Sequence, residues 1–194
     1  QDVGAGQDVG AGQDVGAGLK PAPTHRRSRL IDVRPAAVPT TLYGIAVDIG
    51  TTTVVVYLVN IESGKVLDIV TAFNQQINYG EDVISRIVYA QKGNGLDDLR
   101  RVVLRTVNEL IGDLEVRNHI SRTDIFDMVA SGNTTMAHLF LGLYPRYIRE
   151  EPYIPTAIHF PSFTAADLGV DINPEASVYC LPGVAAYVGG DITS

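Results

Sequence analysis

This sequence has almost no cysteine and no long apolar run. Cys180 is the single cysteine among 194 residues. One thiol excludes an internal disulfide, and also an iron–sulfur cluster or a cysteine-based zinc site held by this chain alone. No stretch reaches the roughly 18 consecutive apolar residues of a transmembrane helix, and the N-terminus lacks the apolar core of a secretory signal. We therefore expect a cytoplasmic protein with no membrane partner.

Charge is present but unevenly distributed. The formal net charge is −7, from 15 basic and 22 acidic residues. Residues 19–42 hold five bases and one acid, whereas residues 43–194 hold ten bases and eighteen acids. An acidic folded part repels a polyanion, so the basic cluster His25–Arg29 is interpreted as part of a solvated linker. We expect no nucleic-acid partner.

The first 42 residues have the composition of an unfolded extension. Residues 1–18 are the hexamer QDVGAG written three times, a low-complexity segment predicted to be disordered because it has little to bury. Residues 19–42 are rich in proline and arginine, which predicts an extended linker.

From Tyr43 the hydrophobic pattern becomes that of a folded α/β domain. The pattern predicts a three-stranded meander, two helices, a buried strand, a short helix, a long irregular connection with four prolines, and a last strand. The acids Glu81 and Asp82 suit the first turn of the first helix. The predicted strands cover 43–50, 53–60, 65–72, 125–130 and 177–181; the predicted helices follow Glu81, open at Asp97 and cover 136–143. This order resembles half of a ribonuclease-H-like domain.

The segment Asp48–Thr53 (DIGTTT) is the first candidate site. A carboxylate ends a buried strand, and a glycine and three hydroxyls follow in a tight turn. Successive N–H groups in such a turn form an anion-binding nest, glycine lets the backbone approach a ligand, and Asp48 could hold Mg²⁺ through a water molecule. A hairpin turn with a capping aspartate is the alternative interpretation.

The segment Ser131–Met136 (SGNTTM) is the second candidate site, again after an apolar strand. Small polar residues at a strand-to-helix junction can present backbone N–H groups to an anion at the helix N-terminus. The alternative is a simple N-cap, in which Asn133 or Thr134 caps the following helix.

Four stretches together carry a family resemblance. The segment 48–53 (DIGTTT) resembles the first phosphate motif of the actin, sugar kinase and Hsp70 ATPase superfamily. The longer strings are 43–57 (YGIAVDIGTTTVVVY), 74–86 (NQQINYGEDVISR), 130–139 (ASGNTTMAHL) and 181–193 (LPGVAAYVGGDIT). In order and over residues 43–194, they resemble one branch of that superfamily, the ATP-dependent reductive activators of corrinoid proteins.

The resemblance implies a function and a set of site residues. Such activators couple ATP hydrolysis to the reduction of a Co(II) corrinoid protein to Co(I) in methyl-transfer metabolism, so ATP and Mg²⁺ are the implied cofactors and a corrinoid protein is the implied partner. A homodimer is a candidate assembly. Asp48 matches the magnesium-facing aspartate, and no catalytic residue is assigned. The implied cofactor-binding residues are Asp48, Gly50, Thr51, Thr52, Thr53, Gly132, Asn133 and Thr134.

Two parts of the family pattern are not found in these 194 residues. The [2Fe–2S] ferredoxin-like domain of full-length relatives would precede residue 43, and the second phosphate loop would follow Gly189–Thr193. We therefore expect a fragment, with a first ribonuclease-H-like subdomain over 43–160 and the start of a second over 161–194. By itself it should be inactive.

Two other function classes stay open at this point. A sugar or small-acid kinase of the same superfamily would use the same phosphate motif, and a folded interaction module would bind no nucleotide. The four histidines lack metal-ligand spacing. Cys180 is expected to be a small buried apolar residue.

Overall fold

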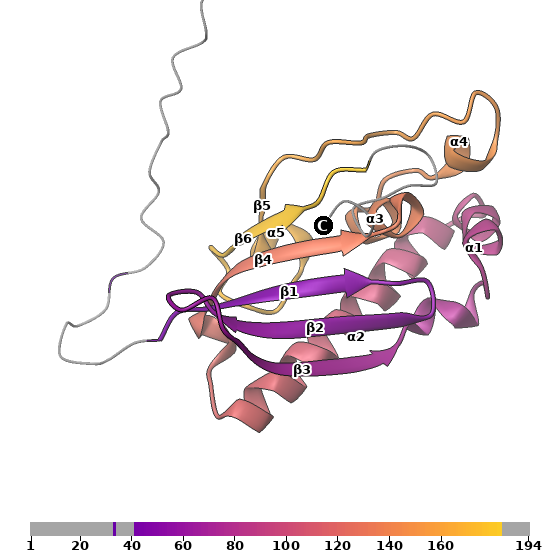
Figure 1. Cartoon of the computed structure of the whole chain (residues 1–194). Coiled ribbons are helices and arrows are strands. Elements are labelled where there is room, and N and C mark those ends of the chain that lie inside the picture. Colours follow the sequence, from indigo (N-terminus) through magenta and orange to yellow (C-terminus); the bar gives the residue numbers. More distant parts are fainter. Residues whose placement is uncertain (1–32, 34–40, 184–194) are drawn as a thin grey trace, which may run out of the picture. The chain divides into compact units, whose positions relative to one another are not determined.

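The computed structural model describes Val33 and residues 41–183 (Figure 1). The sequence predictions for the QDVGAG repeat, for most of the linker and for Gly189–Thr193 lie outside the described residues.

The described chain is built on one mixed sheet of six strands in the order β3-β2-β1-β4-β6-β5. β1, β2 and β3 form an antiparallel meander, β4 and β6 run parallel to β1, and β5 is antiparallel to β6. The strands are β1 (Tyr43–Ile49), β2 (Thr53–Asn60), β3 (Val66–Phe73), β4 (Ile125–Gly132), β5 (Phe163–Thr164) and β6 (Ser177–Cys180).

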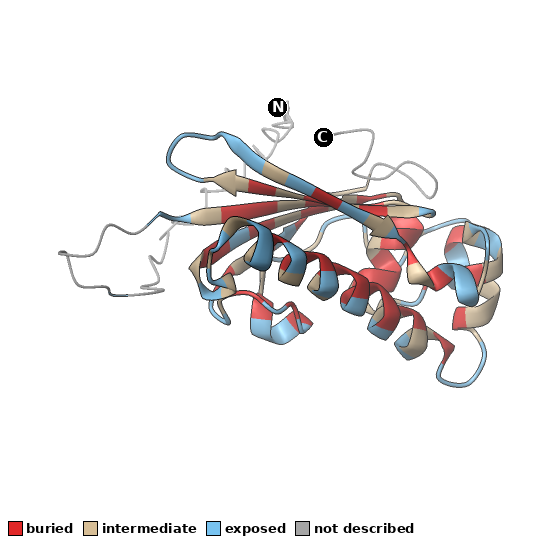
Figure 2. Ribbon diagram, turned by 90° about the horizontal axis from the view of Figure 1, so that it is seen from below, coloured by how far each residue is buried: buried red, intermediate tan, exposed pale blue. Residues whose placement is uncertain are grey.

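Alternation along β1 decides which face of the sheet is buried. Ile45, Val47 and Ile49 are buried, while Ala46 and Asp48 between them are more exposed. Successive strand residues point to opposite faces, so one face packs against helices and the other carries Asp48. Figure 2 shows the long helix α2 (Gly95–Asn118) lying along the buried face.

The helices return the chain from the meander to β4, as a parallel crossover requires. α2 carries Asp97 and Asp98 in its first turn and Arg117 in its last, so its charges complement the helix dipole. It begins two residues earlier than the sequence predicted. The remaining helical elements are η1 (Gln75–Asn78), α1 (Val83–Ala90), η2 (Arg122–Asp124), α3 (Thr134–Leu141), α4 (Arg146–Arg149) and α5 (Ala165–Leu168).

The acids before α1 do not lie in its first turn. The helix begins at Val83, and Asp82 is its N-cap, with the carboxylate accepting from Ser85 N at 2.7 Å. Ser85 Oγ accepts from Asp82 N at 3.1 Å, which completes a capping box. These bonds lower the pKa of Asp82. Asp82 therefore has a structural partner in the described chain, as the helix-start interpretation requires.

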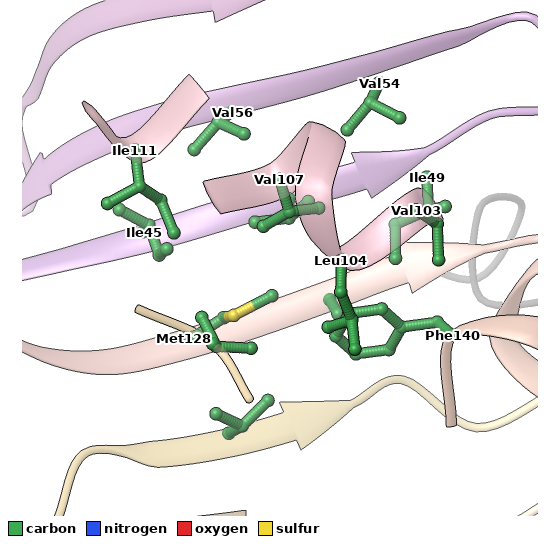
Figure 3. Close-up of a cluster of buried hydrophobic side chains, with 14 of the residues drawn as sticks. Ile45, Ile49, Val54, Val56, Val103, Leu104, Val107, Ile111, Met128 and Phe140 are labelled. Carbon is green, nitrogen blue, oxygen red and sulfur yellow. The ribbon is translucent and has the colours of Figure 1, made fainter. Parts of the chain in front are cut away.

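The core lies between α2, α3 and the sheet. Along α2, five apolar residues at helical spacing form one stripe, and all five are buried: Leu99, Val103, Val107, Leu110 and Leu114. Figure 3 shows Phe140 of α3 beside Leu104 of α2, with Met128 of β4 in the same cluster. Burial of such side chains supplies most of the stability of a small domain.

The predicted fold class is confirmed: the meander, the crossover helices and the parallel strands form an α/β, ribonuclease-H-like half-domain. The sheet continues across residue 160, because β6 pairs with β4 and β5 pairs with β6. The subdomain boundary expected at residue 160 stays a prediction. The short elements α4, β5 and α5 within 144–168 were not predicted.

Within the described residues, no helix has the length and apolarity needed to cross a membrane.

Cys180 is buried at 2% exposure in β6. Burial raises the pKa of its thiol to about 12, so the thiol is protonated at neutral pH. This confirms the prediction that Cys180 is a small buried apolar residue.

Candidate phosphate-binding site

The two candidate segments meet at one edge of the sheet. β1 and β4 are parallel neighbours, with Asp48 opposite Ser131 and Ile49 opposite Gly132. The turn that follows β1 and the helix start that follows β4 therefore come from adjacent strand ends. Gly132 makes this closeness possible, because a Cβ at this position would lie 2.8 Å from the carbonyl oxygen of Ile49.

Asn133 joins the two segments directly. Its Nδ2 donates to Thr51 Oγ1 at 3.1 Å, across 82 residues of sequence. Its Oδ1 accepts from Met136 N at 3.0 Å and caps α3. The N-cap interpretation for Asn133 is therefore correct. The same side chain also hydrogen-bonds to the turn Gly50–Thr53 between β1 and β2, which we call the threonine turn. Thr134 is the first residue of α3 and is buried.

Gly50 sets the shape of the turn between β1 and β2. Its N–H donates to Thr53 O at 2.9 Å. A Cβ at residue 50 would lie 2.6 Å from that same oxygen, closer than non-bonded atoms approach. The turn is therefore built for glycine at this position.

The carbonyl groups of three successive turn residues are all engaged from inside the protein. Gly50 O accepts from Asn74 Nδ2 at 2.9 Å, and Thr52 O accepts from Asn74 N at 2.8 Å. Between them, Thr51 O accepts from Arg86 Nη2 at 2.6 Å. Two residues beyond the meander thus fix the orientation of three consecutive peptide groups.

This orientation turns the N–H groups outward. In a trans peptide the C=O and N–H point to opposite sides, so inward carbonyls leave the N–H groups of the next residues facing away from the core. Within the described residues, the N–H groups of Thr51 and Thr52 donate no hydrogen bond. Thr51 is half-buried and Thr52 is exposed. Outward successive N–H groups of this kind form an anion-binding nest.

Asp48 lies two residues before this turn, on the sheet face opposite α2. Its side chain is exposed and lines a pocket of about 290 Å³, together with Ser131 of β4 and Tyr57 of β2. No cluster of three or more His, Cys, Asp or Glu side chains suited to a metal ion is found in the described part of the chain. A cation here would have one carboxylate ligand and would keep most of its water, as Mg²⁺ does.

Asn74 and Arg86 are site residues that the sequence reasoning did not assign. Both are fully buried, and both lie in the string 74–86 that was quoted only for its resemblance. A local signal exists for Arg86, because it stands beside Ile87 in the buried face of α1. Arginine is almost never fully buried without a partner, so an arginine at this position indicates specific hydrogen-bond partners inside the protein.

His138 lies on the buried side of α3 and bonds to the first turn of that helix. Its Nδ1 lies 2.7 Å from Thr134 O, and its Nε2 lies 3.4 Å from Ala157 N. A neutral ring with the proton on Nδ1 satisfies both contacts, because the carbonyl needs a donor and the N–H needs an acceptor. Burial lowers the pKa of His138 below its usual 6.5.

We expect this buried histidine to make the fold less stable in mild acid. Above about pH 6.5 the ring is neutral in both the folded and the unfolded state, so its full contribution to the free energy of unfolding is present. As the pH falls below that value, the unfolded chain takes up the proton first, so the free energy of unfolding decreases. Urea unfolding at pH 7.5 and 5.5 checks this. The loss on acidification should be smaller in His138→Asn, and an equal loss in both proteins would contradict the assignment.

A larger groove of about 890 Å³ runs along the outer side of α2 and carries no residue of either candidate segment. It is lined by side chains that include Arg100, Arg101 and Arg105. Arg101 pairs with Asp98 at 2.5 Å, and Arg100 donates to Leu168 O at 2.9 Å. No residue of the turn between β1 and β2 lines this groove, so the two are separate features.

Comparison with known proteins places the chain in a family. The family described as the RACo middle region matches residues 43–194. The chain belongs to this family. The match contains both candidate segments and the string from Asn74 to Arg86.

Two relatives show the same region in longer proteins. A curated protein of Eubacterium limosum, "Corrinoid activation enzyme RamQ", is 40% identical over 154 residues, which is 79% of this chain and 26% of that protein. A solved structure named "Reductive activator for corrinoid,iron-sulfur protein" is 48% identical, with a TM-score of 0.79 over 81% of this chain and 25% of that chain. The chain spans about a quarter of the length of these two relatives.

Proposed function

We propose that this RACo middle region is the first phosphate-binding half of an ATP-dependent activator that returns Co(II) corrinoid proteins to Co(I). One observation carries the proposal. The carbonyls of Gly50, Thr51 and Thr52 are held inward, so the turn presents N–H donors toward solvent. The names of the two relatives, which refer to corrinoid activation, support the reaction class and the corrinoid partner.

Each site residue has a distinct task in this proposal. The N–H groups of Thr51 and Thr52 bind phosphate oxygens of ATP, and Thr53 with Gly50 keeps the turn closed. Asn133 holds Thr51 and places the N-terminus of α3 beside the turn, where the helix dipole favours an anion. Thr134 opens α3 there, and Gly132 allows the two strand ends to approach. Bound Mg²⁺ would neutralise the phosphate charge, with Asp48 holding it through a water molecule.

The rest of the nucleotide clamp would come from segments outside this chain. Closure of two halves around ATP excludes water and is a usual way to couple hydrolysis to a conformational change. In the intact activator we propose that this closure drives electron transfer from a [2Fe–2S] domain to the corrinoid. Such a protein would work in the cytoplasm, and a homodimer remains its proposed assembly.

The proposal is tested by a chimera in which residues 43–194 replace the matched region of the Eubacterium limosum relative. We expect ATP-dependent activation of a Co(II) corrinoid protein, followed by its absorbance change. Asp48→Ala in the same chimera should reduce activation at least about tenfold, because the magnesium site loses its carboxylate. Lys65→Ala, an exposed change at the far end of the meander, is the control. Equal activity of the Asp48 variant would contradict the assignment of the phosphate site.

The 194 residues alone should show little or no ATP turnover. Their sequence holds one DxGTT motif, whereas a closing clamp needs a second phosphate loop. Phosphate release from Mg·ATP, measured beside an intact relative, checks this. A turnover number close to that of the relative would contradict the view of this chain as one half of a clamp.

A further inference from the structure

Arg86 is a buried cation surrounded by neutral acceptors. Its Nε donates to Gly80 O at 2.9 Å, and its Nη1 donates to Gln76 Oε1 at 3.1 Å and contacts Met136 Sδ at 3.3 Å. Its Nη2 donates to Thr51 O at 2.6 Å. The side chain is fully buried. All four acceptors are uncharged. They satisfy the hydrogen-bond donors of the guanidinium but do not neutralise its positive charge.

The described residues supply no direct countercharge. No carboxylate among them lies within ion-pair distance of Arg86. Asp82 acts on it only over a longer distance, and that carboxylate is already bound to Ser85. Burial lowers the pKa of Arg86 to about 10, so the guanidinium is still charged at neutral pH. A buried charge of this kind is costly without an opposite charge nearby.

The threonine turn lacks a basic residue of its own to balance the charge of a bound anion. Residues 43–64 contain no lysine or arginine, although phosphate sites commonly include one. The guanidinium lies directly behind this turn, on the carbonyl side of the Thr51–Thr52 peptide group, while the N–H of Thr52 faces the other side. One peptide group therefore separates the buried cation from the position where an anion would bind.

We propose that Arg86 is the countercharge for phosphate bound at the threonine turn and acts through the Thr51–Thr52 peptide group. This inference rests on the proposed phosphate site and adds the residue that supplies its charge. A donor on the carbonyl oxygen polarises the peptide and strengthens its N–H as a donor, because hydrogen bonds in a chain reinforce one another. Arg86 is a positioning residue, since the Thr51–Thr52 peptide lies between it and the ligand. Asn74 acts in the same way, without charge, on the Gly50–Thr51 peptide group.

A purely structural role for Arg86 makes a different prediction. If Arg86 only tied η1, α1 and the turn together, its charge would not matter once the variant is folded. Arg86→Met removes the charge and keeps a long side chain, but it also leaves the acceptors on Gly80, Gln76 and Thr51 without this donor. Arg86→Lys keeps the charge and loses the planar fork of donors. The charge role predicts that the lysine variant binds phosphate better than the methionine variant.

The test is a titration of the whole 194-residue chain with Mg·ATP and, separately, with inorganic tripolyphosphate, followed through the amide signals of Thr51 and Thr52 by NMR. We expect Arg86→Met to weaken binding of both probes by about tenfold or more, as expected for a lost charge-assisted interaction. Arg86→Lys should bind within about threefold of the parent chain, and the Thr52 signal should change most. Arg101→Gln, an exposed arginine of α2, is the control and should change binding less than twofold.

The outcomes separate this inference from the proposed function. If the parent chain shows no saturable shift at the turn, the proposed phosphate site is wrong and the inference falls with it. If the parent chain binds and a folded Arg86→Met binds equally well, the phosphate site stands and the charge role is overturned. Equal losses in folded Arg86→Met and Arg86→Lys also overturn it. If Arg86→Met does not fold, Arg86→Gln, which keeps an amide donor toward Thr51, takes its place with the same expected loss.

Discussion

Gly50→Ala should strongly weaken phosphate binding at the threonine turn while leaving the sheet folded. The new Cβ would lie 2.6 Å from Thr53 O, the atom that accepts from Gly50 N. Relief of this contact requires the turn to reshape, which rotates the outward N–H groups of Thr51 and Thr52. We expect the free energy of unfolding to fall by about 1–3 kcal/mol, as for other overpacking substitutions. We expect affinity for Mg·ATP to fall at least about tenfold, because the nest depends on the direction of those N–H groups.

Gly44→Ala is the matched control on the same strand. Its Cβ would meet Ile61 Cγ1 at 3.3 Å, the side chain of a residue that can shift, at the opposite end of β1. Affinity for Mg·ATP should then stay within about twofold of the parent chain, since this site is remote from the turn. Urea unfolding and the amide titration measure both quantities in the two variants. Normal nucleotide binding by Gly50→Ala would contradict the turn geometry as the source of binding.

Phe140→Ala should strongly destabilise the described chain. Phe140 is fully buried in α3 beside Leu104, in the cluster that also contains Met128. Removing a buried phenyl group leaves a cavity and typically costs about 3–5 kcal/mol. Because α3 carries Asn133 at its N-terminus, the cavity should also loosen the contact of Asn133 with Thr51.

Phe73→Ala is the matched control, because it removes the same phenyl group from an exposed position. Phe73 is 74% exposed at the end of β3, so its removal should change the free energy of unfolding by no more than about 0.5 kcal/mol. Urea unfolding of both variants gives the comparison. Similar losses in the two proteins would contradict the placement of the core between α2, α3 and the sheet.

Periodicity in the sequence was enough to predict the regular elements. The apolar run of β1, the β-branched and aromatic residues of β2 and the apolar stripe of α2 are strong local patterns, and the structure confirms these three elements. The short elements α4, β5 and α5 lack such patterns, because two to four residues cannot establish a period. Helix starts were also imprecise: α3 begins at Thr134, since Asn133 rather than a later residue supplies the cap.

The candidate site was predictable only in part. The motif around Asp48 and the segment at Asn133 are visible because glycine and small polar residues follow buried strands. Their contact depends on the parallel pairing of β1 with β4, which no local pattern specifies. The inward carbonyls depend on Asn74 and Arg86, whose side chains act on residues 24 and 35 positions away. Tertiary contacts of this kind cannot be derived from local composition.

We propose that the Gly50–Thr53 turn binds phosphate through its outward N–H groups. A crystal structure of this chain soaked with a non-hydrolysable Mg·ATP analogue at millimolar concentration tests it most directly. We predict phosphate oxygens within about 2.7–3.2 Å of the nitrogens of Thr51 and Thr52, with the Arg86–Thr51 contact retained. A nucleotide bound elsewhere, or a turn whose carbonyls face the phosphates, would show that this turn is not the phosphate site.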